Sequence, residues 1–221
     1  MSQEDMTALQ HLGLTIELLQ NQLIAAREFY MQAMCEQLAL QPGAQPQQRV
    51  RFDSPVGTQA ERDGDKLWPG AWFDATGYCT QRPNGDYHTG VDLNLPAFAD
   101  TGEIVRACAD GVVVFSGQLS AWGYVVVVQH ALEDGVKVWS RYAHLNGNQP
   151  MAVKGDVVQR GKYLAVIGDY GKAGPPDDHV HFDLAKIDLG VKPGDWPGPD
   201  RERVLRDYYD PMAFIQEHHH G

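Results

Sequence analysis

Two short histidine motifs carry the side chains best suited to chemistry. In HTGVD, His88 precedes Asp92 by four residues, and in HVHF a single valine separates His179 from His181. Imidazole and carboxylate groups are both good zinc ligands, so His88 and Asp92 can converge on one cation. In a β-strand, residues i and i+2 share a face, so His179 and His181 are predicted to face one cleft while their neighbours enter the core.

Each motif alone is short enough to arise by chance, but both belong to an ordered series. HxGxDxxxP begins at His88 and is followed by ADGVV (109–113), YAHL (142–145), GDVV (155–158) and HVHF (179–182). This series resembles the lysostaphin/LytM family of peptidoglycan zinc endopeptidases. The resemblance extends over about residues 86–185, and Asp210-Pro211 resembles the family's closing Asp-Pro.

The resemblance implies a role for five residues. His88, Asp92 and His181 would bind one Zn²⁺ per chain, with water or substrate at the fourth position, as in catalytic zinc sites. His179 and His144, the histidine of YAHL, correspond to the family's two catalytic histidines that do not bind metal. Near zinc-activated water, one imidazole can accept a proton while the other stabilises the oxyanion or protonates the leaving amine. The sequence leaves open which histidine does which.

The other histidines are expected to have no part in this chemistry. His11 lies in a predicted N-terminal helix, and His130 ends the apolar run GYVVVVQH, so both are predicted to be structural. His218 to His220 form a terminal cluster, which is typical of a disordered tail that cannot hold a metal in a fixed orientation.

The elements that must position these residues are predicted to be strands. From about residue 68, β-branched runs punctuated by glycine recur at a spacing typical of an antiparallel sheet or sandwich. We therefore expect a mainly β catalytic domain of the LytM (duplicated hybrid motif) type, with an N-terminal α-helical arm. Residues 190–200 should break regular structure, and residues 201–217 allow one or two short helices. Positive φ angles are expected at the turn glycines Gly111, Gly123, Gly135, Gly147, Gly161 and Gly168.

The N-terminal part differs in composition from the rest. Apolar residues alternate at spacings of three and four from Leu9 to Tyr30, which predicts a helix with a coiled-coil-like seam. This seam can pack on its own domain, on another protein, or on a second copy through residues 9–30. QPGAQPQQ (41–48) is typical of a linker. The predicted division is an arm over 1–41, a linker over 42–67, the endopeptidase domain over 68–217 and a His-rich tail over 218–221.

The composition of the chain limits the classes of molecule that it is expected to bind. The chain has 221 residues, 43% of them hydrophobic, with a net charge of −11 and no basic cluster, which argues against nucleic acid and anionic membranes as partners. Its three cysteines are dispersed, so at most one bridge, between Cys79 and Cys108, is conceivable. Neither a signal peptide nor a long apolar run is visible, so no membrane insertion is expected, although the family resemblance implies an envelope or extracellular location.

These observations favour a zinc metalloendopeptidase that hydrolyses peptide bonds in peptidoglycan stem peptides or cross-bridges. The main alternative is a non-catalytic LytM-like module that binds peptidoglycan or activates another hydrolase, although such members typically lose metal or catalytic residues. Residues 153–168 also resemble a biotinyl or lipoyl carrier, but the lysine that a carrier needs between its half-motifs is missing. A generic zinc esterase or lactonase shares the metal ligands but not the ordered flanking motifs.

Overall fold

The computed structural model describes residues 50–64, 68–96, 100–168 and 178–219. They belong to one compact unit, residues 48–221. The predicted helical arm over 1–41, the self-association seam over 9–30 and the beginning of the linker lie outside the described residues, and they remain predictions.

Strands dominate the described part of the chain. The strands are β1 (Phe73–Thr76), β2 (Val91–Asn94), β3 (Ile104–Arg106), β4 (Gly111–Leu119), β5 (Gly123–Ala131), β6 (Lys137–Leu145), β7 (Val157–Val158), β8 (Tyr163–Val166), β9 (Val180–Ala185) and β10 (Tyr208–Tyr209). The helices are α2 (Gln59–Arg62), α3 (Arg201–Asp207) and α4 (Pro211–His218). Each predicted β-branched run contains a strand, whereas β1, β2 and β10 were not predicted.

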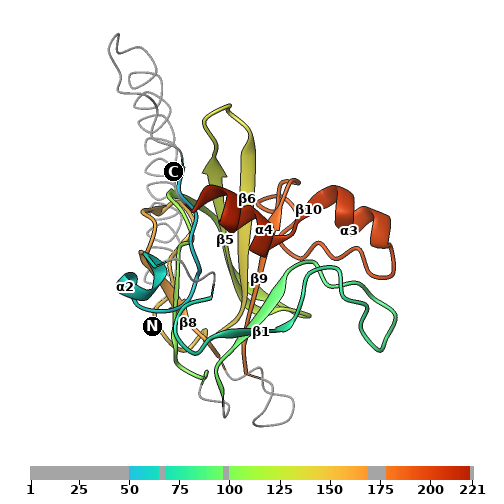
Figure 1. Cartoon of the computed structure of the whole chain (residues 1–221), viewed down its shortest axis with the longest axis horizontal. Helices are drawn as coiled ribbons and strands as arrows, with labels where there is room; N and C mark the ends of the chain where they lie inside the picture. Colours follow the sequence, from blue (N-terminus) through green and yellow to red (C-terminus); the bar gives the residue numbers. More distant parts are fainter. Residues whose placement is uncertain (1–49, 65–67, 97–99, 169–177, 220–221) are drawn as a thin grey trace, which may run out of the picture. The chain divides into compact units, whose positions relative to one another are not determined.

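The strands form one large antiparallel sheet and one small one. The large sheet has the order β1-β2-β9-β6-β5-β4-β7, with β10 also paired to β9, and β3 pairs with β8 in the small sheet. In Figure 1, β5, β6 and β9 lie in the middle of the domain, and α3 and α4 follow at its C-terminal end. The expected mainly β, antiparallel architecture is confirmed.

Strand β9 shows how the sheet separates core from site. Val180, Phe182 and Leu184 are fully buried in the main hydrophobic core. Ala185 belongs to a second apolar cluster, which includes Trp122 and Trp139. Because side chains alternate along a strand, His181 and Asp183 project from the face opposite the main core. The predicted orientation of this segment is therefore confirmed.

Both chain segments that flank the predicted domain pack onto it. Phe52 is fully buried, and Asp53 forms a buried ion pair with Arg62 of α2, so residues 50–64 of the predicted linker belong to the packed domain. At the other end, His218 stacks on Phe214, with ring centroids 4.1 Å apart. His219 is buried, so these two residues are packed, contrary to the expected disordered tail.

The predicted closing helices are confirmed, and side chains cap both. The Asp200 carboxylate accepts a hydrogen bond from the Arg203 amide at the start of α3. Asp210 caps α4 in the same way, and Pro211 occupies its first turn, where its missing N–H costs nothing. The Asp-Pro pair therefore starts the last helix of the domain.

Half of the expected glycine conformations are wrong. Gly123, Gly135 and Gly161 have positive φ, but Gly111, Gly147 and Gly168 do not. These three lie where another chain segment approaches closely: a Cβ on Gly147, for example, would lie 2.1 Å from the Tyr124 ring. Glycine is needed at these positions for space rather than for backbone conformation.

The described cysteines do not form a bridge. Cys79 is half-buried and Cys108 is buried, and both are free thiols. None of the described helices is long and apolar enough to cross a membrane.

Candidate metal centre and active site

Strand register brings together two of the predicted metal ligands. Strands β2 and β9 are antiparallel neighbours, and Asp92 lies directly opposite His181 in their pairing. On its other side, His181 lies opposite Ala143 of β6, the residue before His144. Three segments far apart in sequence therefore converge at one point of the sheet.

His88, Asp92 and His181 form a compact, buried cluster. His88 Nε2 lies 2.8 Å from His181 Nδ1, and Asp92 Oδ1 lies 3.1 Å from each of these nitrogens. Ligand atoms bound tetrahedrally to zinc at about 2.0–2.1 Å lie roughly 3.3 Å apart, so these three atoms need only a small outward adjustment. The donor set fits a metal ion. Among the described residues, it is the one group of three potential ligands whose atoms all lie within 4.8 Å of one another.

Backbone contacts orient His88. Its Nδ1 lies 3.2 Å from the Gly77 carbonyl oxygen, so an Nδ1–H donor there leaves Nε2 with its lone pair toward the cluster. The His88 amide donates to the Thr80 carbonyl, and the Cys79 amide donates to the His88 carbonyl. A Cβ on Gly90 would lie 2.1 Å from the Phe182 carbonyl oxygen, so glycine lets this segment approach β9.

His144 and His179 lie beside the cluster. In the pairing of β5 with β6, Ala143 and His144 together lie opposite one residue, so β6 has a bulge here. His144 has a φ of +62°. Such a conformation is rare for a residue with a side chain and often marks a functional position. The rings of His144 and His179 have centroids 4.8 Å apart, and His179 Nε2 lies 3.5 Å from Asp92 Oδ1. All five predicted residues therefore meet at one place.

Burial and neighbouring charges set the protonation of this cluster. Burial lowers the pKa of His144 well below its usual value, and the nearby imidazoles of His179 and His181 lower it further. Burial alone would raise the pKa of Asp92, but the bonds from His181 and His88 hold that pKa well below its usual value. At neutral pH the site therefore combines an ionised carboxylate with a neutral His144 imidazole.

A cavity of about 500 Å³ opens beside the histidines, and His144, His179 and His181 all line it. Trp122 and Trp196 form part of its wall, with ring centroids 5.3 Å apart. Neither tryptophan was predicted, because no motif or periodicity in the sequence places them near the histidines. This groove lies next to the candidate metal ligands.

Arg82 also lines the groove and was missed. Its guanidinium donates to Asp92 Oδ2 at 3.1 Å and lies 5.5 Å from the centre of the Trp196 ring. It is about one-third exposed, so it places a positive charge at the edge of the cluster. The charge near the metal ligands is therefore more balanced than the acidic composition of the chain suggests.

His130 is separate from the site, as predicted. Its Nδ1 lies 2.8 Å from the Asp110 carbonyl oxygen, and its Nε2 lies 2.7 Å from Ser140 Oγ. The side chain is fully buried, and burial lowers its pKa to about 4. Both ring nitrogens are satisfied inside the domain, which is typical of a structural histidine.

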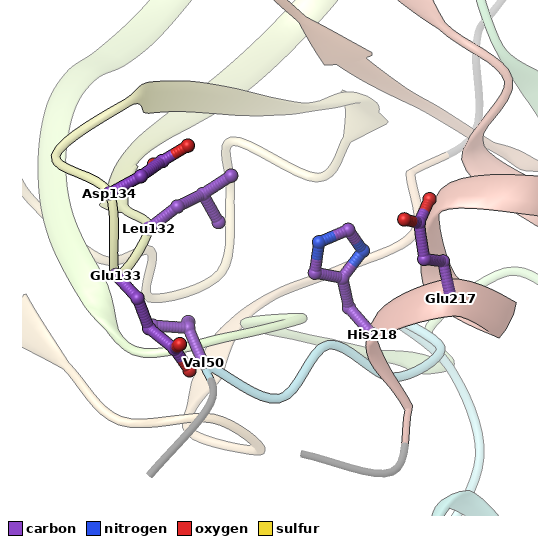
Figure 2. Close-up of a pocket in the computed structure, with 6 residues that line it drawn as sticks. All are labelled: Val50, Leu132, Glu133, Asp134, Glu217 and His218. Atoms are coloured by element: carbon purple, nitrogen blue, oxygen red, sulfur yellow. The ribbon is translucent and has the colours of Figure 1, made fainter. Parts of the chain in front are cut away.

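A second, smaller cavity of about 250 Å³ lies elsewhere in the domain. Figure 2 shows His218 at the end of α4 together with Val50 and the turn that carries Leu132, Glu133 and Asp134. His218 Nδ1 lies 2.8 Å from the Phe214 carbonyl oxygen, within its own helix. Among the described residues, the acidic side chains here do not form a compact ligand group with His218.

Comparison with known proteins points to one family. Residues 86–193 match the model of Peptidase family M23. The DD-carboxypeptidase/endopeptidase Mpg of Neisseria meningitidis serogroup B is 34% identical over 96 residues, which make up 43% of this chain and 19% of that protein. The murein hydrolase activator EnvC of Escherichia coli K12 is 34% identical over 101 residues, 45% of this chain and 22% of that protein. The chain thus spans about a fifth of the length of these curated relatives.

A solved structure supports the same fold. The crystal structure of cbpa from L. salivarius REN is 15% identical and superposes with a TM-score of 0.52, covering 76% of this chain and 97% of that one. The family match covers every motif of the ordered series seen in the sequence, from HxGxDxxxP to HVHF. The match to Peptidase family M23 thus spans all five residues of the candidate site, from His88 to His181.

Proposed function

We propose that the protein is a zinc-dependent endopeptidase that hydrolyses peptide bonds in peptidoglycan stem peptides or cross-bridges, in the cell envelope or outside the cell. The observation that carries this proposal is that two further histidines, His144 and His179, line the same groove as the metal ligand His181. A module that only binds peptidoglycan has no need of imidazoles at that place. The family assignment supports peptide hydrolysis as the reaction.

Each part of the site has a task in this proposal. His88, Asp92 and His181 would hold the zinc ion in a buried pocket. A zinc ion held there supplies Lewis-acid chemistry, because it polarises the scissile carbonyl and acidifies a water molecule. The rings of His144 and His179 lie at the open side of the cluster. Between them they would accept a proton from the attacking water, stabilise the developing oxyanion and return a proton to the leaving amine.

The groove would hold the substrate on one side of the ligands. Trp122, which is buried, and Trp196 give the groove an apolar wall, and Arg82 gives it a positive charge. Such a wall excludes water and fixes the position of the scissile bond, which is where positioning contributes to rate.

A second candidate function is activation of a separate hydrolase. It is favoured by the similarity to EnvC, which is named as a murein hydrolase activator. In that case the groove would bind a protein segment or an uncleaved wall peptide. The presence of all five predicted catalytic and ligand residues in one site favours hydrolysis.

One experiment separates the two functions. Zinc-loaded full chain is incubated with purified peptidoglycan, and the released muropeptides are identified by mass spectrometry beside His144→Ala protein. Fragments released by the wild type alone support the endopeptidase, and their masses identify the cleaved bond. No release by wild-type protein that holds one zinc ion contradicts catalysis, and stimulation of a separate murein hydrolase would then support the activator.

A further inference from the structure

Asp183 is a buried carboxylate that touches one of the proposed metal ligands. It lies two residues after His181 in β9, so both side chains project from the same face of the strand. Asp183 Oδ2 lies 3.0 Å from His181 Nε2, accepts a hydrogen bond from Thr89 Oγ1 at 2.7 Å, and forms an ion pair with Arg141. Asp183 and Arg141 are fully buried.

This contact determines which nitrogen of His181 faces the cluster. An ionised carboxylate can only accept, so the imidazole donates its Nε2–H to Asp183. With Nε2 turned to Asp183, Nδ1 is the nitrogen that faces the cluster and would bind zinc; it lies 2.8 Å from His88 Nε2 and 3.1 Å from Asp92 Oδ1. A carboxylate behind a metal-binding histidine fixes the ring orientation and raises its basicity.

Arg141 connects this carboxylate to the wall of the groove. It lies directly opposite Asp183 in the pairing of β6 with β9. Arg141 Nη2 pairs with Asp183, and Arg141 Nη1 donates to the carbonyl oxygens of Pro193 and Asp195, at 3.0 and 2.9 Å. Its guanidinium also lies over the Trp122 ring, 3.8 Å from the ring centre. One side chain therefore contacts the carboxylate, the groove wall and the segment that precedes Trp196.

We propose that Asp183 and Arg141 are positioning residues: Asp183 sets the tautomer and orientation of His181, and Arg141 holds Asp183 and the tryptophan wall of the groove in one arrangement. The inference rests on the proposed zinc site. A buried ion pair by itself contributes little net stability relative to well-packed apolar residues. Stability alone therefore does not explain why this ion pair is present. Its contact with a proposed metal ligand points to a role in positioning that ligand.

The chain contains a matched control for Asp183. Asp53 is equally buried and pairs with two arginines, Arg62 and Arg160, but it contacts no residue of the cluster. Replacing either aspartate removes one buried, ion-paired carboxylate, so the two variants should lose comparable stability. Only the Asp183 variant should change the metal site.

The test measures zinc affinity of the full chain by competition with a chelator. Asp183→Ala is expected to weaken zinc binding about 10- to 100-fold relative to Asp53→Ala, the usual range for removing a group that supports a metal ligand. Asp183→Asn retains an oxygen that can accept from His181 and should recover part of this loss. Asp53→Asn should bind zinc like the wild type.

Two further readouts distinguish positioning from general structural damage. In zinc-loaded protein, the ¹⁵N chemical shifts of the His181 ring should indicate a metal-bound Nδ1 and a protonated Nε2 in wild type and in both Asp53 variants, and a mixture of ring orientations in Asp183→Ala. Arg141→Lys should raise KM for peptide more than it lowers kcat, whereas Arg62→Lys, at the equally buried Arg62, should change neither.

The outcomes are separable from failure of the proposed function. If the wild type binds no zinc, the zinc site itself is wrong. If the wild type binds zinc but Asp183→Ala matches Asp53→Ala in both affinity and tautomer, the positioning role is overturned. If the Ala variants do not fold, the comparison between Asp183→Asn and Asp53→Asn decides, because each keeps the size of the original side chain. Equal zinc affinity and the same His181 tautomer in these two would likewise overturn the role.

Discussion

Asp92 and His181 lie opposite each other across the β2–β9 pair, with Asp92 Oδ1 3.1 Å from His181 Nδ1. Cross-strand neighbours have their Cβ atoms about 4.5–5.5 Å apart, so this pairing alone brings two ligand side chains within reach of one ion. His88 joins them from the segment before β2. The proposed metal site is therefore built on the central sheet rather than on a loop alone.

Removing either of these residues should abolish tight zinc binding. Asp92→Ala and His181→Ala each leave two protein ligands where a catalytic zinc site uses three. We expect stoichiometric zinc in the wild type and far below one ion per chain in both variants, measured by metal analysis after dialysis. His130→Gln, a change at a buried histidine outside the site, should retain its zinc. Full zinc content in Asp92→Ala would contradict the ligand assignment.

His144→Ala should separate catalysis from metal binding. The side chain is not one of the three proposed ligands, so zinc content should stay near one ion per chain. Turnover of peptidoglycan peptides should fall about 10²- to 10⁴-fold, the usual contribution of a general acid or base. His218→Ala, in the second cavity, is the matched control and should retain activity. Loss of zinc equal to that of Asp92→Ala would place His144 among the ligands instead.

Gly90→Ala should damage both the fold and the site. A Cβ at this position would lie 2.1 Å from the Phe182 carbonyl oxygen and 2.5 Å from Asp183 Cβ, so β9 must move. We expect a loss of about 1–3 kcal/mol or more in the free energy of unfolding, together with weaker zinc binding. Gly117→Ala in β4 is the control, because its nearest neighbour there is 3.5 Å away. Equal unfolding curves for the two variants would show that β9 tolerates the extra atom.

The buried His130 should make stability depend on pH. Its pKa is about 4 in the folded protein because of burial, against about 6.5 in an unfolded chain. Between these values the unfolded state binds a proton that the folded state excludes. The free energy of unfolding is therefore unaffected by the titration of His130 above pH 6.5. As the pH falls toward 4, protonation of the unfolded state lowers it by about 3 kcal/mol in total.

Urea unfolding at several pH values between 7 and 4.5 tests this prediction. The wild type should lose more stability on acidification than His130→Gln, whose side chain does not titrate. The difference in slope between the two proteins should approach one proton in this window. Parallel curves would mean that His130 is protonated in the folded protein as readily as in the unfolded chain.

Local sequence determined the β-rich architecture and indicated the candidate site residues. Alternating and β-branched runs specify strands because side chains project to opposite faces with a period of two, which is a local property. That is why the runs around Val126 and Phe182 and the paired orientation of His179 and His181 were predicted correctly. The strands β1, β2 and β10 were missed because their sequences, FDAT, VDLN and YY, contain no run of β-branched residues.

Only the tertiary structure decided how these residues meet and what supports them. The register that places Asp92 opposite His181, and Arg141 opposite Asp183, depends on pairing between strands far apart in the sequence. The packing of Trp122 against Arg141 likewise comes from long-range contacts that leave no local pattern. The same holds for Gly147, where the approach of the Tyr124 ring rather than a turn requires glycine. Strand formation and side-chain alternation depend on neighbouring residues and can be predicted from them. Contacts between distant segments form only when the whole sheet assembles.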